Sequence, residues 1–196
     1  GKNTNLISKK DGSMFFLGEI FTDIPLEPSK VAPKNHCGTC KECIDVCPTK
    51  AIIAPYQLDA NRCISYLTIE SKKSIPIEFR KSIGNRIFGC DDCQLFCPWN
   101  KYAKLTAVTD FAPRHGLEKT KLTDLFLLDE DEFEKFTIGS AIRRVSYPQW
   151  IRNVAIALGN APTSPEVLQA LEKRLTFPDE MVLEHVNWAI LEHKKN

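Results

Sequence analysis

The sequence has no long apolar run, and its charges nearly cancel. No stretch approaches the ~20 consecutive apolar residues that a membrane-spanning helix requires, so we expect no membrane span. The 26 Lys and Arg residues stand against 25 Asp and Glu residues, a formal net charge of +1. This balance argues against indiscriminate binding to polyanions but leaves room for a local basic patch. The first residues lack the pattern of a secretory signal peptide, so we expect a reducing, cytoplasmic location in which disulfides are rare.

Against this ordinary soluble composition, with 43% hydrophobic and 26% charged residues, the spacing of the cysteines is the most informative feature. Four cysteines occur as C-x2-C-x2-C-x3-C-P and three as C-x2-C-x3-C-P, with a single cysteine between the two motifs. In order, they are Cys37, Cys40, Cys43 and Cys47, then Cys63, then Cys90, Cys93 and Cys97. Bacterial two-cluster ferredoxins use this spacing, and there the cysteine before the proline binds the other cluster.

The ferredoxin pattern accounts for all eight cysteines. It predicts one [4Fe-4S] cluster held by Cys37, Cys40, Cys43 and Cys97, and a second held by Cys63, Cys90, Cys93 and Cys47. Structural zinc is the main alternative because it also binds C-x2-C pairs, although four thiolates within about eleven residues favour a cubane over a tetrahedral ion. Disulfides would need an oxidising compartment. His36 is next to a cysteine, but eight thiols suffice without it.

The chain divides into three predicted domains. Residues 1–34 contain two short apolar segments around an Asp-Gly turn signal, followed by a proline-rich linker; Asn5–Ser8 and Ser13–Thr22 are predicted as paired strands, or as a strand and a helix. Because such segments cannot form a core alone, we expect the remnant of a larger domain, with a cap on the cluster domain as the alternative. Residues 35–105 form the predicted double-cluster domain, and residues 106–196 a helical domain.

The cluster domain departs from a minimal ferredoxin between its two motifs. Ala51–Ile53 is predicted as a short strand after the first motif. The segment between Cys63 and Cys90 is longer than a plain ferredoxin has, and Pro76 begins a predicted helix in it that ends at Gly84. This insertion indicates a function beyond electron exchange.

Helical spacing dominates the last third of the sequence. It predicts helices over Leu122–Phe136 and Pro165–Leu175, with an acidic run on a solvated face of the first. The segment Arg152–Leu158 resembles Glu184–Ile190, and a helical unit that recurs after about 30 to 45 residues is typical of HEAT-like repeats. A four-helix bundle is the alternative. The predicted fold class is α+β: a ferredoxin-like two-[4Fe-4S] domain followed by an all-α HEAT-like helical repeat.

Several segments resemble the epoxyqueuosine reductases, a family of cobalamin-dependent enzymes of tRNA modification. They are Gly1–Thr4, Phe15–Glu19, Leu58–Glu70, Gly89–Asn100 and Arg152–Asn160, and together they cover the chain in order. This family also has an N-terminal cobalamin-binding α/β domain. By this resemblance, residues 1–34 are the remnant of that domain, and the rest of it would precede Gly1.

The resemblance implies a two-electron reduction. The epoxide of epoxyqueuosine, at the wobble position of tRNA, would become the alkene of queuosine with loss of water. The two clusters would pass electrons from a low-potential donor, such as a ferredoxin or flavodoxin, to cobalamin, with the second cluster nearer the corrin. The proton donor would lie in the preceding domain, so no catalytic residue is assigned here. The chain alone is expected to be monomeric and inactive.

The resemblance also suggests cobalamin contacts. Ser65 and the backbone of Cys90 and Asp91 would contact the cofactor, with Thr4 or Gly18 lining the same pocket. For Ser65 and Asp91, the alternative is ordinary turn hydrogen bonding or a hydrogen bond to a cluster sulfur.

Basic residues between positions 61 and 104 outnumber acidic ones and predict a local tRNA-binding surface. The basic residues of this stretch are Arg62, Lys72, Lys73, Arg80, Lys81, Arg86, Lys101 and Lys104. The predicted tRNA contacts are Lys72, Lys73, Arg143, Arg144 and Arg152. Tyr147 and Trp150 are candidates for stacking on anticodon bases, although helical spacing favours core packing for Trp150.

Two other functions fit part of the sequence. A corrinoid reductive dehalogenase would share the clusters and cobalamin, but it usually carries an export signal and has no need for a helical repeat. A plain two-cluster ferredoxin would explain the cysteines alone, leaving the insertion and the helical third without a function.

Overall fold

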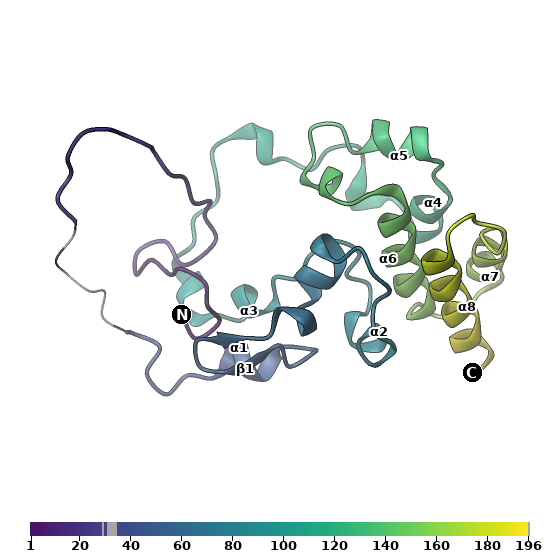
Figure 1. Cartoon of the computed structure of the whole chain (residues 1–196), viewed down its shortest axis with the longest axis horizontal. Coiled ribbons are helices and arrows are strands. Elements are labelled where there is room, and N and C mark those ends of the chain that lie inside the picture. The colour runs from purple at the N-terminus through teal and green to yellow at the C-terminus, as the bar shows by residue number, and fades with distance from the viewer. Residues whose placement is uncertain (29, 31–34, 196) are drawn as a thin grey trace. The chain divides into compact units, whose positions relative to one another are not determined.

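The computed structural model describes residues 1–28, 30 and 35–195 (Figure 1). The end of the predicted proline-rich linker lies outside these residues. In the part of the chain that the structure describes, no helix is both long and apolar enough to cross a membrane.

The chain forms two compact units, and each is assembled from two separate stretches of sequence. The first consists of residues 1–59 and 91–107, and the second of residues 60–90 and 108–196. The first unit therefore carries most of the cysteines, whereas Cys63 and Cys90 belong to the second. The sequence analysis expected consecutive domains, but here the chain leaves the first unit after Asp59 and returns to it at Asp91.

The first unit has short elements and few buried apolar side chains. Its regular elements are α1 (Glu42–Val46), β1 (Ile52–Ala54), β2 (Gln57–Leu58), α3 (Asp92–Leu95) and a 3₁₀ turn over Pro98–Tyr102. The two strands pair antiparallel with Ile52 opposite Leu58, which confirms the short strand predicted after the first motif. Among the apolar residues described in this unit, only Cys43, Ala51 and Ile52 are buried. So small a core fits the expectation that clusters stabilise this unit.

The N-terminal segment forms a turn but not the predicted elements. Ser8 and Gly12 exchange two backbone hydrogen bonds, of 2.7 and 3.0 Å, around the Asp-Gly turn. Ser13–Thr22 forms neither strand nor helix, so that prediction is wrong. Phe16, Ile20 and Phe21 are 84%, 93% and 93% exposed. Apolar spacing yields regular structure where the side chains pack on a surface, and these side chains stay largely in solvent.

The second unit is a helical body around α6. Figure 1 shows α4, α6, α7 and α8 packed side by side, and within α6 the whole stretch Gln149–Gly159 is buried. Gly159 lies where α6 meets α8: an added Cβ would stand 2.6 Å from the Trp188 ring and 2.9 Å from the Ala189 Cα. The helices of the second unit are α2 (Ile77–Ile83), α4 (Leu122–Leu127), α5 (Glu130–Phe136), α6 (Tyr147–Gly159), α7 (Pro165–Glu172), α8 (Glu180–Lys194) and a π-helix at Tyr66–Glu70. This unit also has 3₁₀ turns at Ala60–Arg62, Thr109–Phe111, Leu117–Lys119 and Ala141–Arg144.

Most helices of this unit match the sequence prediction. Pro76 precedes α2 and Gly84 follows it, as expected. The single helix predicted over Leu122–Phe136 is wrong, because it breaks into α4 and α5. The Asp129 side chain accepts a hydrogen bond from the Glu132 backbone, and the Glu132 side chain accepts one from the Asp129 backbone. This capping box begins a new helix at Glu130. The acidic run is exposed, as predicted, and it also has a structural function as the cap of α5.

The aromatic residues of α6 pack in the core rather than face solvent. Trp150 is completely buried, and its indole N–H donates to the Leu125 carbonyl at 3.0 Å. Tyr147 is 8% exposed and donates to the Leu128 carbonyl at 2.7 Å. The core packing favoured for Trp150 is therefore confirmed, and the candidate function of these two rings in stacking on RNA bases is wrong.

The two similar segments of the helical third lie on α6 and α8, which contact each other. A HEAT-like relationship between them stays a prediction.

Candidate iron–sulfur centres

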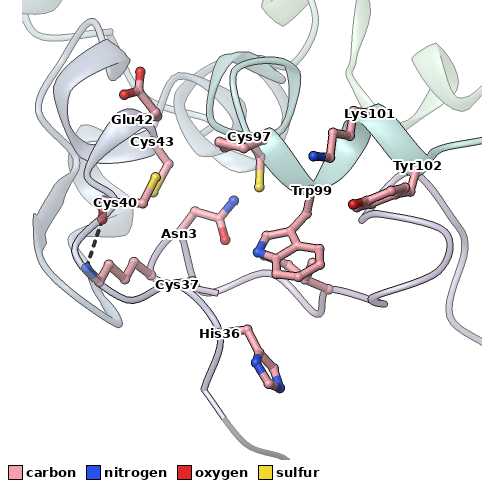
Figure 2. A pocket seen from close by; sticks show the side chains of 13 residues that line it. Asn3, His36, Cys37, Cys40, Glu42, Cys43, Cys97, Trp99, Lys101 and Tyr102 are labelled. Carbon is pink, nitrogen blue, oxygen red and sulfur yellow. Dashed lines mark hydrogen bonds between the residues drawn. The ribbon is translucent and has the colours of Figure 1, made fainter.

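Four of the predicted cluster ligands line one cavity of the first unit. Cys37, Cys40 and Cys43 come from the first motif, and Cys97 comes from the end of the second. The cavity has a volume of about 250 Å³, and Figure 2 shows Cys97 across from Cys40 and Cys43, with the Trp99 ring beside them. The remaining lining residues are Lys2, Asn3, Ile7, His36, Glu42, Pro98, Lys101 and Tyr102. The structure thus brings together the ligand set predicted for the first cluster.

The backbone around the first motif is held by local hydrogen bonds. The Cys40 amide donates to the Cys37 carbonyl at 3.0 Å, which closes a turn. The Asn35 side chain accepts from the Cys37 amide at 2.9 Å. The Lys2 ammonium donates to the carbonyls of Gly38 (2.6 Å) and Cys40 (2.8 Å), so a residue of the N-terminal segment closes the loop from outside.

The electrostatics of the cavity favour a cationic occupant. Burial raises the pKa of the Cys43 thiol, and the negative charges of Cys40, Cys37 and Cys97 raise it further. Without a cation, the Cys43 thiol therefore resists forming the thiolate that binds metal. Bound iron supplies that charge and reverses the effect.

The arrangement fits a cubane better than a single ion. Within the described residues, no group of three or more His, Cys, Asp or Glu side chains is arranged to hold one metal ion. In a [4Fe-4S] cubane each cysteine binds a different iron, so the ligands surround a volume instead of converging on a point. None of the eight cysteines, all of which the structure describes, forms a disulfide. The donor set and the cavity therefore suit the predicted first cluster.

The ligands predicted for the second cluster belong to both units. In the first unit, the Cys47 sulfur accepts from the Ala51 amide at 3.2 Å, and the Cys93 sulfur accepts from the Asn5 side-chain amide at 3.9 Å. N–H groups directed at ligand sulfurs tune the potential of a cluster. Cys63 and Cys90 are described with the second unit, so the assignment of the four to one cluster rests on motif spacing and stays a prediction.

The residues predicted to contact cobalamin have different surroundings. The Ser65 hydroxyl accepts from the Cys90 amide at 3.3 Å, so it supports a cysteine loop. Asp91 is exposed before α3, and its side chain does not cap that helix. Thr4 is exposed with a positive φ of 69°, and Gly18 is exposed, so that a Cβ added there would meet nothing within 4 Å. Their contact with cobalamin stays a prediction.

Of the predicted tRNA contacts, all but one are exposed. Lys72 and Lys73 lie in the loop after the π-helix. Arg143 and Arg144 lie on a 3₁₀ turn and form ion pairs with Glu134 and Glu70, respectively. Surface pairs of this kind are worth about 0 to 1 kcal/mol, so these arginines can exchange partners for phosphates.

Arg152 is the exception, because it is completely buried. It donates to the carbonyls of Leu67 (2.8 Å), Ser71 (2.8 Å) and Lys73 (2.6 Å), and to the Asn153 side chain. Every guanidinium nitrogen thus has an acceptor inside the protein. Burial lowers its pKa to about 10, so it stays charged at neutral pH. The prediction that Arg152 contacts tRNA is wrong.

Arg80 is also internal and reduces the basic surface expected between residues 61 and 104. Its side chain is 3% exposed, pairs with Glu184 and donates to the Ile75 carbonyl. The sequence analysis also missed Asn153 and Thr68, which are buried and tie the segments around Cys63 and Cys90 together. The only feature of the sequence that could have pointed to Asn153 was its position in one of the two similar helical segments.

Comparison with known proteins defines the class of this site. A family model for a 4Fe-4S double cluster binding domain matches residues 36–100, the range that contains all eight cysteines. The chain therefore carries a double [4Fe-4S] cluster domain.

The chain is also homologous to the epoxyqueuosine reductases over almost its whole length, and this confirms the resemblance seen in the sequence. It is 54% identical over 193 residues to the epoxyqueuosine reductase of Pseudomonas aeruginosa, a match that covers 98% of the chain and 54% of the relative. The structure of epoxyqueuosine reductase from Streptococcus thermophilus matches all of the chain and 51% of that protein, with a TM-score of 0.81 and 32% identity.

A crystal structure of epoxyqueuosine reductase with an epoxyqueuosine-modified tRNA stem loop is similar as well. It has a TM-score of 0.73 and 30% identity, and the match covers 98% of the chain and 60% of that protein. The chain spans about half the length of the curated relatives it matches.

Proposed function

We propose that this chain is the electron-transfer and tRNA-docking part of a cytoplasmic enzyme that reduces epoxyqueuosine to queuosine in tRNA. The observation that carries the proposal is the cavity lined by Cys37, Cys40, Cys43 and Cys97, which joins residues of both cysteine motifs in a chain homologous to the epoxyqueuosine reductases. A plain electron carrier would not need the helical unit on which the Cys63–Cys90 segment is folded.

The proposed reaction consumes two electrons and two protons. The C–O bonds of the epoxide break, an alkene forms, and the oxygen leaves as water. A low-potential donor such as a ferredoxin or flavodoxin supplies the electrons. The reduction potentials of iron–sulfur clusters span roughly −700 to +450 mV, so such clusters can work at low potential. Cobalamin would supply the reductive chemistry at the epoxide when bound, and Ser65, Cys90, Asp91, Thr4 and Gly18 are the residues proposed to contact it.

For the tRNA, the structure offers a preformed basic loop. Arg152 and the Gln149 side chain, at 3.0 Å, both donate to the Ser71 carbonyl, and Arg152 also donates to that of Lys73. Hydrogen bonds from two side chains of α6 thus hold the backbone of this loop, while the Lys72 and Lys73 side chains are exposed to solvent. A loop that is ordered before binding loses less entropy on contact with phosphates.

Reversing the charge of both lysines, Lys72→Glu with Lys73→Glu, is expected to weaken binding of a tRNA anticodon stem loop at least about tenfold. The slope of log affinity against log salt should fall by about 1 for each phosphate that the loop no longer neutralises. Fluorescence anisotropy over a salt series measures both. Lys9→Glu with Lys10→Glu is the matched control, since these adjacent lysines are exposed in the other unit. An unchanged salt slope in the Lys72 and Lys73 variant would remove this loop from the interface.

The function itself is tested by nucleoside analysis of bulk tRNA from cells that lack the gene. Accumulated epoxyqueuosine and absent queuosine, both reversed by the intact gene, are the expected result. Normal queuosine in a cell with no redundant enzyme would overturn the proposal, and the clusters would then serve another acceptor.

A further inference from the structure

A buried amide on α6 connects the two segments that carry Cys63 and Cys90. Asn153 is 1% exposed, and its Nδ2 donates to the carbonyl of Thr68 at 2.7 Å and to that of Ile87 at 3.0 Å. Thr68 lies in the π-helix that follows Cys63, and Ile87 shortly precedes Cys90. One side chain of the helical body therefore binds both cysteine segments at once.

Two hydroxyl groups complete this connection. Thr68 is completely buried, and its Oγ1 donates to the Ile64 carbonyl at 2.7 Å and accepts from the Gly89 amide at 2.9 Å. Ser65 accepts from the amide of Cys90 itself at 3.3 Å. Gly89 has a φ of +75°, a conformation that glycine adopts without strain, so the loop can turn its N–H groups toward both hydroxyls.

The orientation of the Asn153 amide is fixed by its neighbour. Arg152 donates to its Oδ1 from Nε at 3.0 Å and from a terminal nitrogen at 2.9 Å. Because a guanidinium only donates, the Asn153 oxygen must face it, and the two N–H groups of the amide must face the carbonyls of Thr68 and Ile87. In the described residues, no buried side-chain nitrogen or oxygen lacks a partner, so the network is closed.

We propose that Asn153, Thr68 and Ser65 form a clamp that positions Cys63 and Cys90 for the second cluster. This inference rests on the two-cluster assignment of the proposed function. The clamp holds the two segments together through contacts that need no iron, so this half of the site is built before the cluster arrives. Since the potential of a cluster depends on its ligand geometry and on nearby hydrogen bonds, the clamp also sets the potential of the second cluster.

The test compares Asn153→Ala with Asn160→Ala in the anaerobically reconstituted chain. Asn160 lies at the end of the same helix, and its amide donates to the carbonyls of Arg80 (2.8 Å) and Gly84 (3.2 Å), away from both cysteine segments. We expect Asn160→Ala to keep about eight irons per chain and Asn153→Ala to fall toward about four. Any second cluster that remains should show an altered electron paramagnetic resonance signal and a shifted midpoint potential, with the first cluster unchanged.

Thr68 provides a second pair of variants that do not disturb Arg152. Thr68→Val keeps the shape but loses the hydroxyl, so it should reproduce the Asn153→Ala signature, and Thr68→Ser should restore the wild-type spectrum and potential. The clamp is overturned if Asn153→Ala and Thr68→Val, compared with Asn160→Ala at matched loss of thermal stability, keep the wild-type iron count, signal and potentials. Should Asn153→Ala not fold, the Thr68 pair decides. A wild-type chain with only about four irons would instead refute the two-cluster assignment itself.

Discussion

Replacing Cys97 by alanine should remove the cluster bound by the first motif, although Cys97 belongs to the second motif in sequence. Cys97 lines the same cavity as Cys37, Cys40 and Cys43, so its loss opens that site. We expect the iron content to be roughly halved, from about eight atoms per chain. The measurement is iron and sulfide per chain, with the electron paramagnetic resonance spectrum of the reduced protein.

Matched variants identify which cluster is lost. Cys97→Ala should give the same residual spectrum as Cys40→Ala, whose cysteine is a local ligand of the first motif. Cys47→Ala should instead match Cys63→Ala, because both residues are assigned to the second cluster. If Cys97→Ala matched Cys93→Ala, and Cys47→Ala matched Cys40→Ala, each motif would bind its own cluster and crossed ligation would be wrong.

The largest expected loss of stability comes from Arg152→Met. The substitution removes the Arg152 donors from the carbonyls of Leu67 and Lys73 and from the Asn153 side-chain oxygen, whereas the Ser71 carbonyl keeps its hydrogen bond from Gln149. Each such group costs about 1 to 3 kcal/mol, so we expect the free energy of unfolding to fall by at least about 3 kcal/mol. Denaturant unfolding of the anaerobic protein followed by circular dichroism measures this loss.

Two further variants show whether burial is the cause. Arg152→Lys keeps the charge but not the planar fork of donors, so an intermediate loss is expected. Arg144→Met removes an arginine whose side chain is 64% exposed and paired with Glu70, and the expected change is within about 1 kcal/mol. Equal effects of Arg152→Met and Arg144→Met would contradict the structural function assigned to Arg152.

The sequence predicted most where the chemistry is distinctive. Cysteines at fixed intervals predict cluster ligands, and Cys97 lines one cavity with the three cysteines of the first motif to which the spacing assigns it. The bounds of α2 followed from Pro76 and Gly84, because these residues act on the backbone locally. Such signals depend on neighbours in the sequence and not on the rest of the fold.

Prediction from the sequence failed where a residue acts through distant partners. Arginine is rarely buried in proteins, so nothing in the sequence pointed to a buried one. The partners of Arg152 are backbone carbonyls about eighty positions earlier, and the pattern of side chains does not show which carbonyls need a donor. The break before α5 was missed because its acidic cap looked like a solvated face. The Ser13–Thr22 segment shows the opposite failure. Its apolar spacing predicted a strand or helix, yet its large apolar side chains are exposed to solvent.

The interleaved course of the chain has a consequence for synthesis on the ribosome. The ligands predicted for the first cluster are all available once Cys97 has emerged, so we expect that cluster to be inserted early. The segment between Cys63 and Cys90 is held by Asn153 on α6, which emerges only much later. Under the proposed clamp, we expect the second cluster to be inserted only after the helical unit has folded, and a nascent chain truncated before α6 to carry one cluster but not two.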